Sequence, residues 1–163
     1  HRSSSVYPDM KKLREVLTQL SDQQKLHILQ QDYTTRPLHR AARRDDTEII
    51  STLLTSLQSS ADRLKLLIVY DKLGTALHSA AILGHTESVK MILECLTADQ
   101  QIQIMSAQWI GDTAIQWAEN RGYTETVRVL REYQHIAEQI QLQLQEEKRR
   151  LYQYRKSLSG KIL

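Results

Sequence analysis

One short phrase occurs three times in this chain, and its regular spacing constrains the fold more than any other feature. The copies are Arg36–Ala42, Thr75–Ala81 and Thr113–Ala118, and their first residues lie 39 and then 38 positions apart (36 to 75, 75 to 113). A phrase that returns every 20–50 residues or so (about one structural unit) is typical of a solenoid, whose units bury their apolar faces against their neighbours. The repetition predicts a stacked array and favours binding over catalysis.

A second segment with helical spacing follows each phrase, at Asp45–Leu54, Gly84–Leu93 and Gly122–Arg131. Each segment begins at Gly or Asp, residue types that tolerate the left-handed conformation in which a preceding helix ends. Thr-Glu comes next, which supplies an N-capping hydroxyl and an acid near the positive helix end. Each unit is therefore expected to be two helices joined by a tight turn.

These residues resemble the ankyrin repeat, whose unit reads Thr-Pro-Leu-His-x-Ala-Ala, two variable residues, Gly-His, x-Glu-x-Val and a Leu pair. The middle copy, Gly74–Leu93, is nearly complete, whereas Arg36, Asp45 and Gln116 depart from the pattern in the outer copies. The resemblance implies an all-α helix-turn-helix solenoid that acts as a non-catalytic protein–protein interaction scaffold. It also implies that His39 and His78 connect neighbouring loops through hydrogen bonds.

The repeats are longer than the ankyrin unit of about 33 residues, and the additional residues follow the Leu pair. They occupy 21–29, 61–69 and 97–105. Ser21 with Gln24, and Thr97 with Gln100, have the spacing of capping boxes that begin helices. We therefore expect an extra short helix in each repeat, in place of the β-hairpin finger of the family.

The array is expected to span residues 9–132, as a half repeat followed by three repeats. Met10–Leu20 matches Thr86–Leu96, two periods later, and so reads as a second helix that lacks its first. Residues 1–8 are expected to be a disordered leader or a cloning remnant. Residues 133–163 are expected to form an extended C-terminal helix that continues the last helix of the array as one rod.

The C-terminal segment has no Gly or Pro between Leu130 and Gly160. Apolar residues alternate at intervals of three and four, with Glu147 as the interruption, and this pattern is typical of a coiled-coil seam. The expected oligomerisation residues are Tyr133, Ala137, Ile140, Leu144, Leu151 and Tyr154. The seam predicts a homo-oligomer or docking to a partner helix; the alternative is a stripe that folds back and caps the open end of the array.

The resemblance places the variable residues just before the Gly position on the concave groove of the array. With two more positions on the same helices, the expected partner-binding residues are Arg40, Arg43, Arg44, Ile82, Leu83, Trp117, Asn120 and Arg121. Such a groove is basic at one end and apolar in the middle, which suits a protein partner with an acidic or phosphorylated segment beside an apolar anchor. The alternatives are arginines solvated beside Asp45 and Glu48, and a Trp117 buried under the C-terminal helix.

Composition and the motifs that the chain lacks also bear on which functions it can have. The net charge of +3 is too small to require nucleic acid, and the single cysteine, Cys95, excludes an internal disulfide. No apolar run approaches the roughly 18 residues of a membrane span, and no phosphate-binding, nucleophile-elbow or zinc-spacing motif occurs. We expect a cytoplasmic protein with no enzymatic activity, cofactor or metal. Its alternatives are an assembly element that acts through the C-terminal helix, or the cytosolic regulatory part of a larger signalling or channel protein.

Overall fold

The computed structural model describes residues 9–31 and 36–162, so the expected leader at residues 1–8 lies outside the described residues. The described residues are helical, apart from turns and two isolated β-bridges. The helices are α1 (Met10–Thr18), α2 (Asp22–Gln31), α3 (Pro37–Arg43), α4 (Thr47–Thr55), α5 (Ser60–Leu67), α6 (Ala76–Ile82), α7 (Thr86–Glu94), α8 (Ala98–Ser106), α9 (Ala114–Arg121) and α10 (Thr124–Ile162). The expected all-α fold is confirmed.

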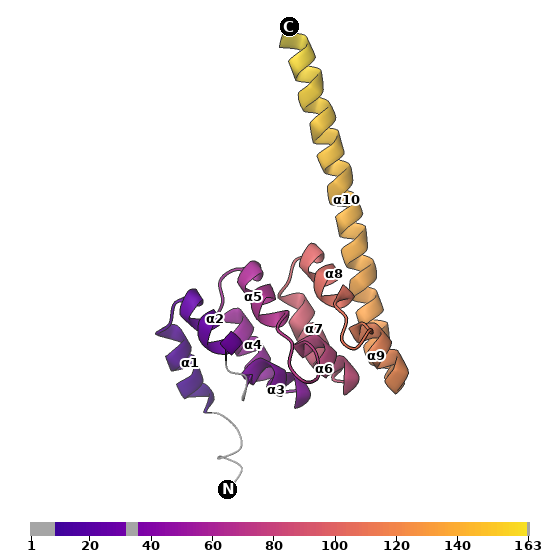
Figure 1. The fold of residues 1–163 in the computed structure, drawn as a ribbon. Helices are drawn as coiled ribbons and strands as arrows, with labels where there is room; N and C mark the ends of the chain where they lie inside the picture. The colour runs from indigo at the N-terminus through magenta and orange to yellow at the C-terminus, as the bar shows by residue number, and fades with distance from the viewer. Residues whose placement is uncertain (1–8, 32–35, 163) are drawn as a thin grey trace.

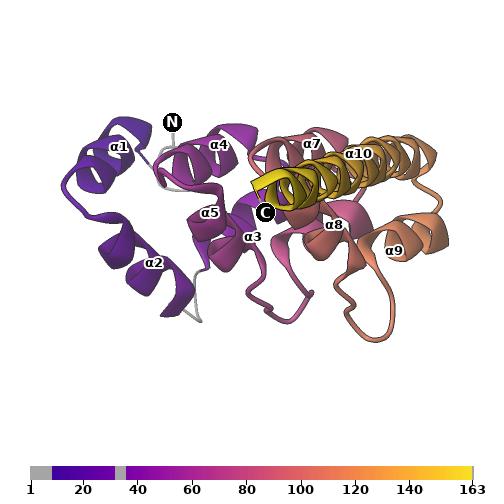
Figure 2. The same ribbon diagram turned by 90° about the horizontal axis from the view of Figure 1, so that it is seen from above.

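The helices stack in three rows (Figures 1 and 2). The inner row is α3, α6 and α9, the outer row is α4, α7 and the start of α10, and the extra helices α2, α5 and α8 form the third. Within each row, every helix contacts the next one. The half repeat contributes α1, at the end of the array, and α2, the first helix of the third row (Figure 1). The solenoid and the extra helix in each repeat are therefore confirmed.

The core repeats with the sequence. Leu38 and Leu77, at the same place in the inner helices, are 2% and 0% exposed, and Ile115 packs half-buried against the same core. In the outer row, Leu54 and Leu93 are likewise buried. Because equivalent positions are buried in successive units, each unit depends on its neighbours for burial of its apolar face.

The capping boxes that predicted the extra helices are present. Ser21 and Gln24 exchange hydrogen bonds of 2.9 and 3.2 Å, and Thr97 and Gln100 exchange bonds of 3.0 and 3.4 Å. Each pair joins the backbone N–H of one residue to the side-chain oxygen of the other, which satisfies two donors at the start of a helix.

The extra helices also hold the carboxyl ends of the outer helices, through one position in each repeat. Lys25 donates to the Ser56 carbonyl oxygen at 2.6 Å, Arg63 to that of Leu54 at 3.0 Å, and Gln101 to that of Leu93 at 2.8 Å. The last carbonyls of a helix lack the regular partners of the helix interior. The side chains donate to them, and those of Leu54 and Leu93 also accept from the backbone N–H groups of Leu57 and Leu96. The three donors lie 38 residues apart (25, 63, 101), a regularity that the sequence analysis missed.

The expectation that the extra helix replaces the finger is wrong. Short two-residue turns precede α6 and α9, where Asp71 pairs with Gly74 and Trp109 pairs with Asp112. In the second turn Ile110 and Gly111 have φ values of 51° and 80°, as a tight hairpin turn requires. The extra helix comes before the turn, and the longer repeat accommodates both.

Helix α10 is one rod of 39 residues, as expected, and it runs unbroken through residues 132 and 133. Its first part belongs to the array, since Leu130 and Ala137 are fully buried. Tyr133 donates to Glu94 of α7 at 2.7 Å, and Gln141 donates to Asp99 of α8 at 3.1 Å. Beyond these contacts the rod projects away from the array (Figure 1). The stripe therefore does not fold back over the open end.

Candidate partner-binding surfaces

Two histidines at the start of the inner helices bind the loop of the next repeat. His39 Nε2 lies 2.7 Å from the Val69 carbonyl oxygen, and His78 Nε2 lies 3.1 Å from that of Ala107. His78 Nδ1 also accepts from the Thr75 N–H at 3.2 Å. Burial lowers the pKa of both rings, although hydrogen bonds to those carbonyls oppose it. Both rings are therefore suited to a neutral form that donates from Nε2, and the expected structural role is confirmed.

The turns after the inner helices present one exposed residue in each repeat. Arg44, Leu83 and Arg121 occupy equivalent positions, 39 and 38 residues apart, and all three are exposed. Among the described residues, neither Arg44 nor Arg121 has an ion-pair partner. We call these three residues the Arg-Leu-Arg row. Its order places an apolar residue between two cations.

Two other expected groove residues lie elsewhere. Ile82 is 4% exposed, so it belongs to the core and cannot contact a partner, whereas its neighbour Leu83 is 38% exposed. Arg43 is held within the chain, because its Nη1 donates to Asp71 Oδ2 at 2.7 Å. Burial alone would raise the pKa of Asp71, but hydrogen bonds from Arg43 and the Leu73 N–H hold it below its usual value. Arg43 therefore fixes the turn before α6.

The Trp117 side chain is half-buried. Its ring centroid lies 4.9 Å from that of Trp109, and its Nε1 donates to the Trp109 carbonyl oxygen at 3.0 Å. The half-buried pair holds the turn before α9, whose tip residue Ile110 is 75% exposed. The remaining expected residues, Arg40 and Asn120, are exposed on α3 and α9.

Cys95 is a half-buried residue at the end of α7. Burial raises the pKa of its thiol to about 11, against the opposing charge of Arg63. The thiol also donates to the Ile92 carbonyl oxygen at 3.1 Å. A thiol protonated at neutral pH is a poor nucleophile, which suits the expected role as a small packing residue.

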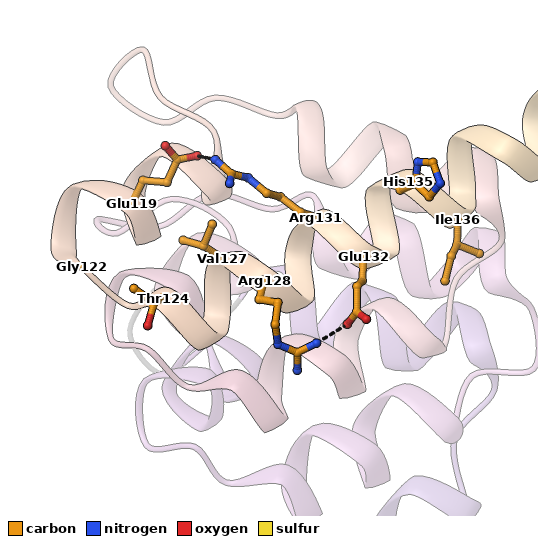
Figure 3. A pocket seen from close by; sticks show the side chains of 9 residues that line it. All are labelled: Glu119, Gly122, Thr124, Val127, Arg128, Arg131, Glu132, His135 and Ile136. Atoms are coloured by element: carbon orange, nitrogen blue, oxygen red, sulfur yellow. Dashed lines mark hydrogen bonds and ion pairs between the residues drawn. The ribbon is translucent and has the colours of Figure 1, made fainter.

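The hollow at the open end of the array, between α9 and α10, is lined by both apolar and charged side chains and has a volume of about 780 Å³. The ion pair of Arg131 with Glu119, at 2.9 Å, joins the two helices, whereas that of Arg128 with Glu132, at 2.8 Å, runs along α10 (Figure 3). Arg131 occupies the position of the buried Leu54 and Leu93. The leucine against which a further unit would pack is thus replaced by a charge, as in the terminal cap of a solenoid.

The expected oligomerisation residues fall into two groups. Ala137 is fully buried and Tyr133 half-buried against the array, so these two act within the chain. The other four lie on the projecting part of α10 and are exposed: Ile140 42%, Leu144 52%, Leu151 52% and Tyr154 62%. Leu158, next in the same series, is 41% exposed.

The family model described as ankyrin repeats (3 copies) matches residues 10–104 and 58–141 of the chain. The chain therefore belongs to the ankyrin-repeat family, whose members are in general protein–protein interaction modules. No curated protein and no solved structure matches the chain. None of the described helices is long and apolar enough to cross a membrane. Within the described ranges, no cluster of three or more His, Cys, Asp or Glu side chains suits a metal ion.

Proposed function

We propose that this protein is a non-catalytic scaffold that binds a segment of another protein across the inner face of its repeats. The observation that carries the proposal is the Arg-Leu-Arg row, in which two exposed arginines flank an exposed leucine and form no ion pair with residues 9–31 or 36–162. Guanidinium groups form paired hydrogen bonds with carboxylate or phosphate. The partner segment therefore carries acidic or phosphorylated residues on both sides of an apolar one.

The spacing of the row sets the length of that segment. Packed helices lie about 8–10 Å apart, so two steps along the array separate Arg44 from Arg121 by roughly 16–20 Å. An extended chain advances about 3.3 Å per residue and covers this distance in about six residues. Arg40 lies near Arg44 on α3 and extends the basic end.

The test is binding of a peptide library in which two acidic or phosphorylated residues, about six positions apart, flank an apolar one. Exchanging Arg44→Glu and Arg121→Glu together is expected to weaken binding by more than about tenfold, because a hydrogen bond to a charged group contributes about 1.5–3 kcal/mol. The control exchanges Lys11→Glu and Lys12→Glu, which are exposed on α1 and change the net charge equally. Equal loss in both variants, or loss in neither, would refute the proposal.

The proposal extends to the setting of the protein. A scaffold of this kind acts in the cytoplasm, alone or as the regulatory part of a larger signalling or channel protein. The second candidate function, assembly through the C-terminal helix, is favoured by the exposed apolar stripe of α10 and is developed next.

A further inference from the structure

The projecting part of α10 has segregated charges. Between residues 132 and 147 the ionised side chains are Glu132, Glu138, Glu146 and Glu147, with no Lys or Arg. Between residues 148 and 161 they are Lys148, Arg149, Arg150, Arg155, Lys156 and Lys161, with no Asp or Glu. The rod therefore has an acidic half beside the array and a basic half beyond it. Hydrogen bonds of Arg149 and Arg150 to Glu146 and Glu147 join the halves at their boundary.

An apolar stripe runs along both halves without a partner. Ile140, Leu144, Leu151, Tyr154 and Leu158 follow one another at intervals of three and four if Glu147 is counted with them, and each is at least 41% exposed. In the same series, Ala137 is fully buried by the array. The unpartnered stripe therefore begins where α10 leaves the array.

We propose that a second copy of this chain covers this stripe, with the two rods antiparallel and centred near Arg149. The inference concerns assembly through α10 and does not depend on binding at the Arg-Leu-Arg row. The charge pattern of the rod favours a second copy as its partner. In antiparallel order the basic half of each rod lies beside the acidic half of the other. In parallel order, basic would lie against basic and acidic against acidic, with like charges opposed.

The register uses every position of the stripe. With the centre near residue 149, Ile140 faces Leu158 of the second copy, Leu144 faces Tyr154, and Glu147 faces Leu151; symmetry repeats each layer. Glu147 then also lies beside Arg150 of the second copy. A parallel pair would instead place Glu147 directly opposite its own counterpart, with two carboxylates in one layer of the seam.

The paired segment of the two rods is short, so their association is weak. Residues 140–158 span about 28 Å at 1.5 Å per residue, or fewer than three heptads. We therefore expect a weak, reversible dimer whose population rises with concentration.

Sedimentation equilibrium of the full chain over a range of concentrations tests the pairing. Leu151→Glu is expected to raise the dimer dissociation constant by at least about tenfold, because each of the two layers that pair position 151 with Glu147 would then hold two carboxylates. Leu142→Glu is the matched control: Leu142 is 59% exposed but lies off the stripe, so the constant should not change. Glu147→Leu should lower the dimer dissociation constant. Circular dichroism at 222 nm, a wavelength that reports about equally on all helices, verifies that each variant stays folded.

Spin labels distinguish the orientation. A label at Gly160→Cys, in a Cys95→Ala background, reports the distance between the two copies of residue 160. Antiparallel rods centred near residue 149 place these labels about 33 Å apart along the rods, whereas parallel rods place them about 10 Å apart. The proposal would be overturned by a chain that stays monomeric at all concentrations, or by a dimer whose dissociation constant Leu151→Glu leaves unchanged. A label-to-label distance of about 10 Å would also overturn it.

Discussion

Single residues at the turn between inner and outer helices couple each repeat to the next. Gly84 and Gly122 adopt φ values of 71° and 78° there, and Asp45 adopts 54° at the equivalent place. Asp45 Oδ1 accepts a hydrogen bond from Ser88 Oγ of α7 at 2.6 Å. Aspartate adopts this left-handed conformation less readily than glycine does. Its carboxylate, however, accepts a hydrogen bond from the buried hydroxyl of the next repeat.

Substitution of these glycines separates backbone strain from packing. A Cβ at Gly84 would lie 2.5 Å from Tyr123 Cδ1, whereas one at Gly122 meets nothing within 4 Å. Left-handed alanine costs about 1–2 kcal/mol, and overpacking adds about 1–3 kcal/mol. Gly84→Ala should therefore lower the free energy of unfolding in urea by about 2–5 kcal/mol, and Gly122→Ala by only about 1–2 kcal/mol. Equal losses would show that the Tyr123 contact is unimportant.

The buried histidines make stability depend on pH. Burial lowers the pKa of His78 from its model-compound value of 6.5, so at mildly acidic pH the unfolded chain binds more protons than the folded one. The contribution of this ring to the free energy of unfolding is therefore constant above about pH 7 and falls as the pH drops through 6.5 toward the lowered folded-state value.

His78→Gln tests the contribution of this ring. Gln116 occupies the same position in the third repeat and keeps the cap, accepting from the Thr113 N–H at 2.8 Å. The variant should lose the hydrogen bond to Ala107 at every pH but show a smaller drop in unfolding free energy between pH 7.5 and 5.5 (an interval of about two units around the reference value). A drop as large as that of the unchanged chain would mean that other groups cause the pH dependence.

At this scale the resemblance to the ankyrin repeat predicted the role of His39 and His78, which two of the three units share. It did not predict roles that depend on a distant residue. Arg43 and Ile82 were placed on the groove from the same resemblance, yet Arg43 reaches Asp71 and Ile82 turns into the core. The direction of those side chains depends on a neighbouring turn, which periodicity does not describe.

Among the elements, the extra helices act as clamps on the outer row. Arg63 donates to the carbonyl oxygens of Leu54 at 3.0 Å, Leu57 at 3.1 Å and, in the next repeat, Cys95 at 3.3 Å. One guanidinium thus serves the carboxyl ends of two outer helices. The extension of each repeat therefore lets α5 join successive units through hydrogen bonds.

Arg63→Met should destabilise the array, because methionine keeps the apolar stem but donates no hydrogen bonds. The Leu54 carbonyl keeps its hydrogen bond from the Leu57 N–H, but those of Leu57 and Cys95 lose the bond from Arg63. Carbonyls left without a partner cost about 1–3 kcal/mol, and thermal unfolding followed by calorimetry should show a loss of that size. Lys65→Met on the same helix is the control, since the Lys65 side chain is 62% exposed and makes only a local ion pair with Asp62; its change should stay within about 0.5 kcal/mol. Equal effects would contradict the clamp.

The helices themselves were predictable because their starts carry local signals. The third helix followed from capping residues three positions apart, which report on backbone nearby in the chain. The turn before α9 was missed because its tip is Ile110 at φ 51°, a conformation that β-branched residues rarely adopt. Trp109 packs against Trp117 of α9 and accompanies that conformation; the spacing of the repeats does not describe this contact.

On the scale of the whole molecule, α10 is both the last helix of the array and a free rod. Burial of Leu130 and Ala137 fixes its first part, whereas Leu144 and Leu151 are each 52% exposed. Arg131 places a charge where the other repeats have a buried leucine, beside the half-buried Val127 and the exposed Ile136. The heptad spacing predicted the rod from sequence, but it could not show where the array stops covering it.

Hydrogen exchange of the full chain, followed by mass spectrometry at low concentration, tests this division most directly. Amides from Thr124 to Gln141 pack against α7, α8 and α9 and should exchange as slowly as those of α6 and α7. Amides beyond Glu146 belong to an unsupported helix and should exchange much faster. Protection that is uniform along all of α10, or lost at Thr124 rather than near Gln141, would contradict the account.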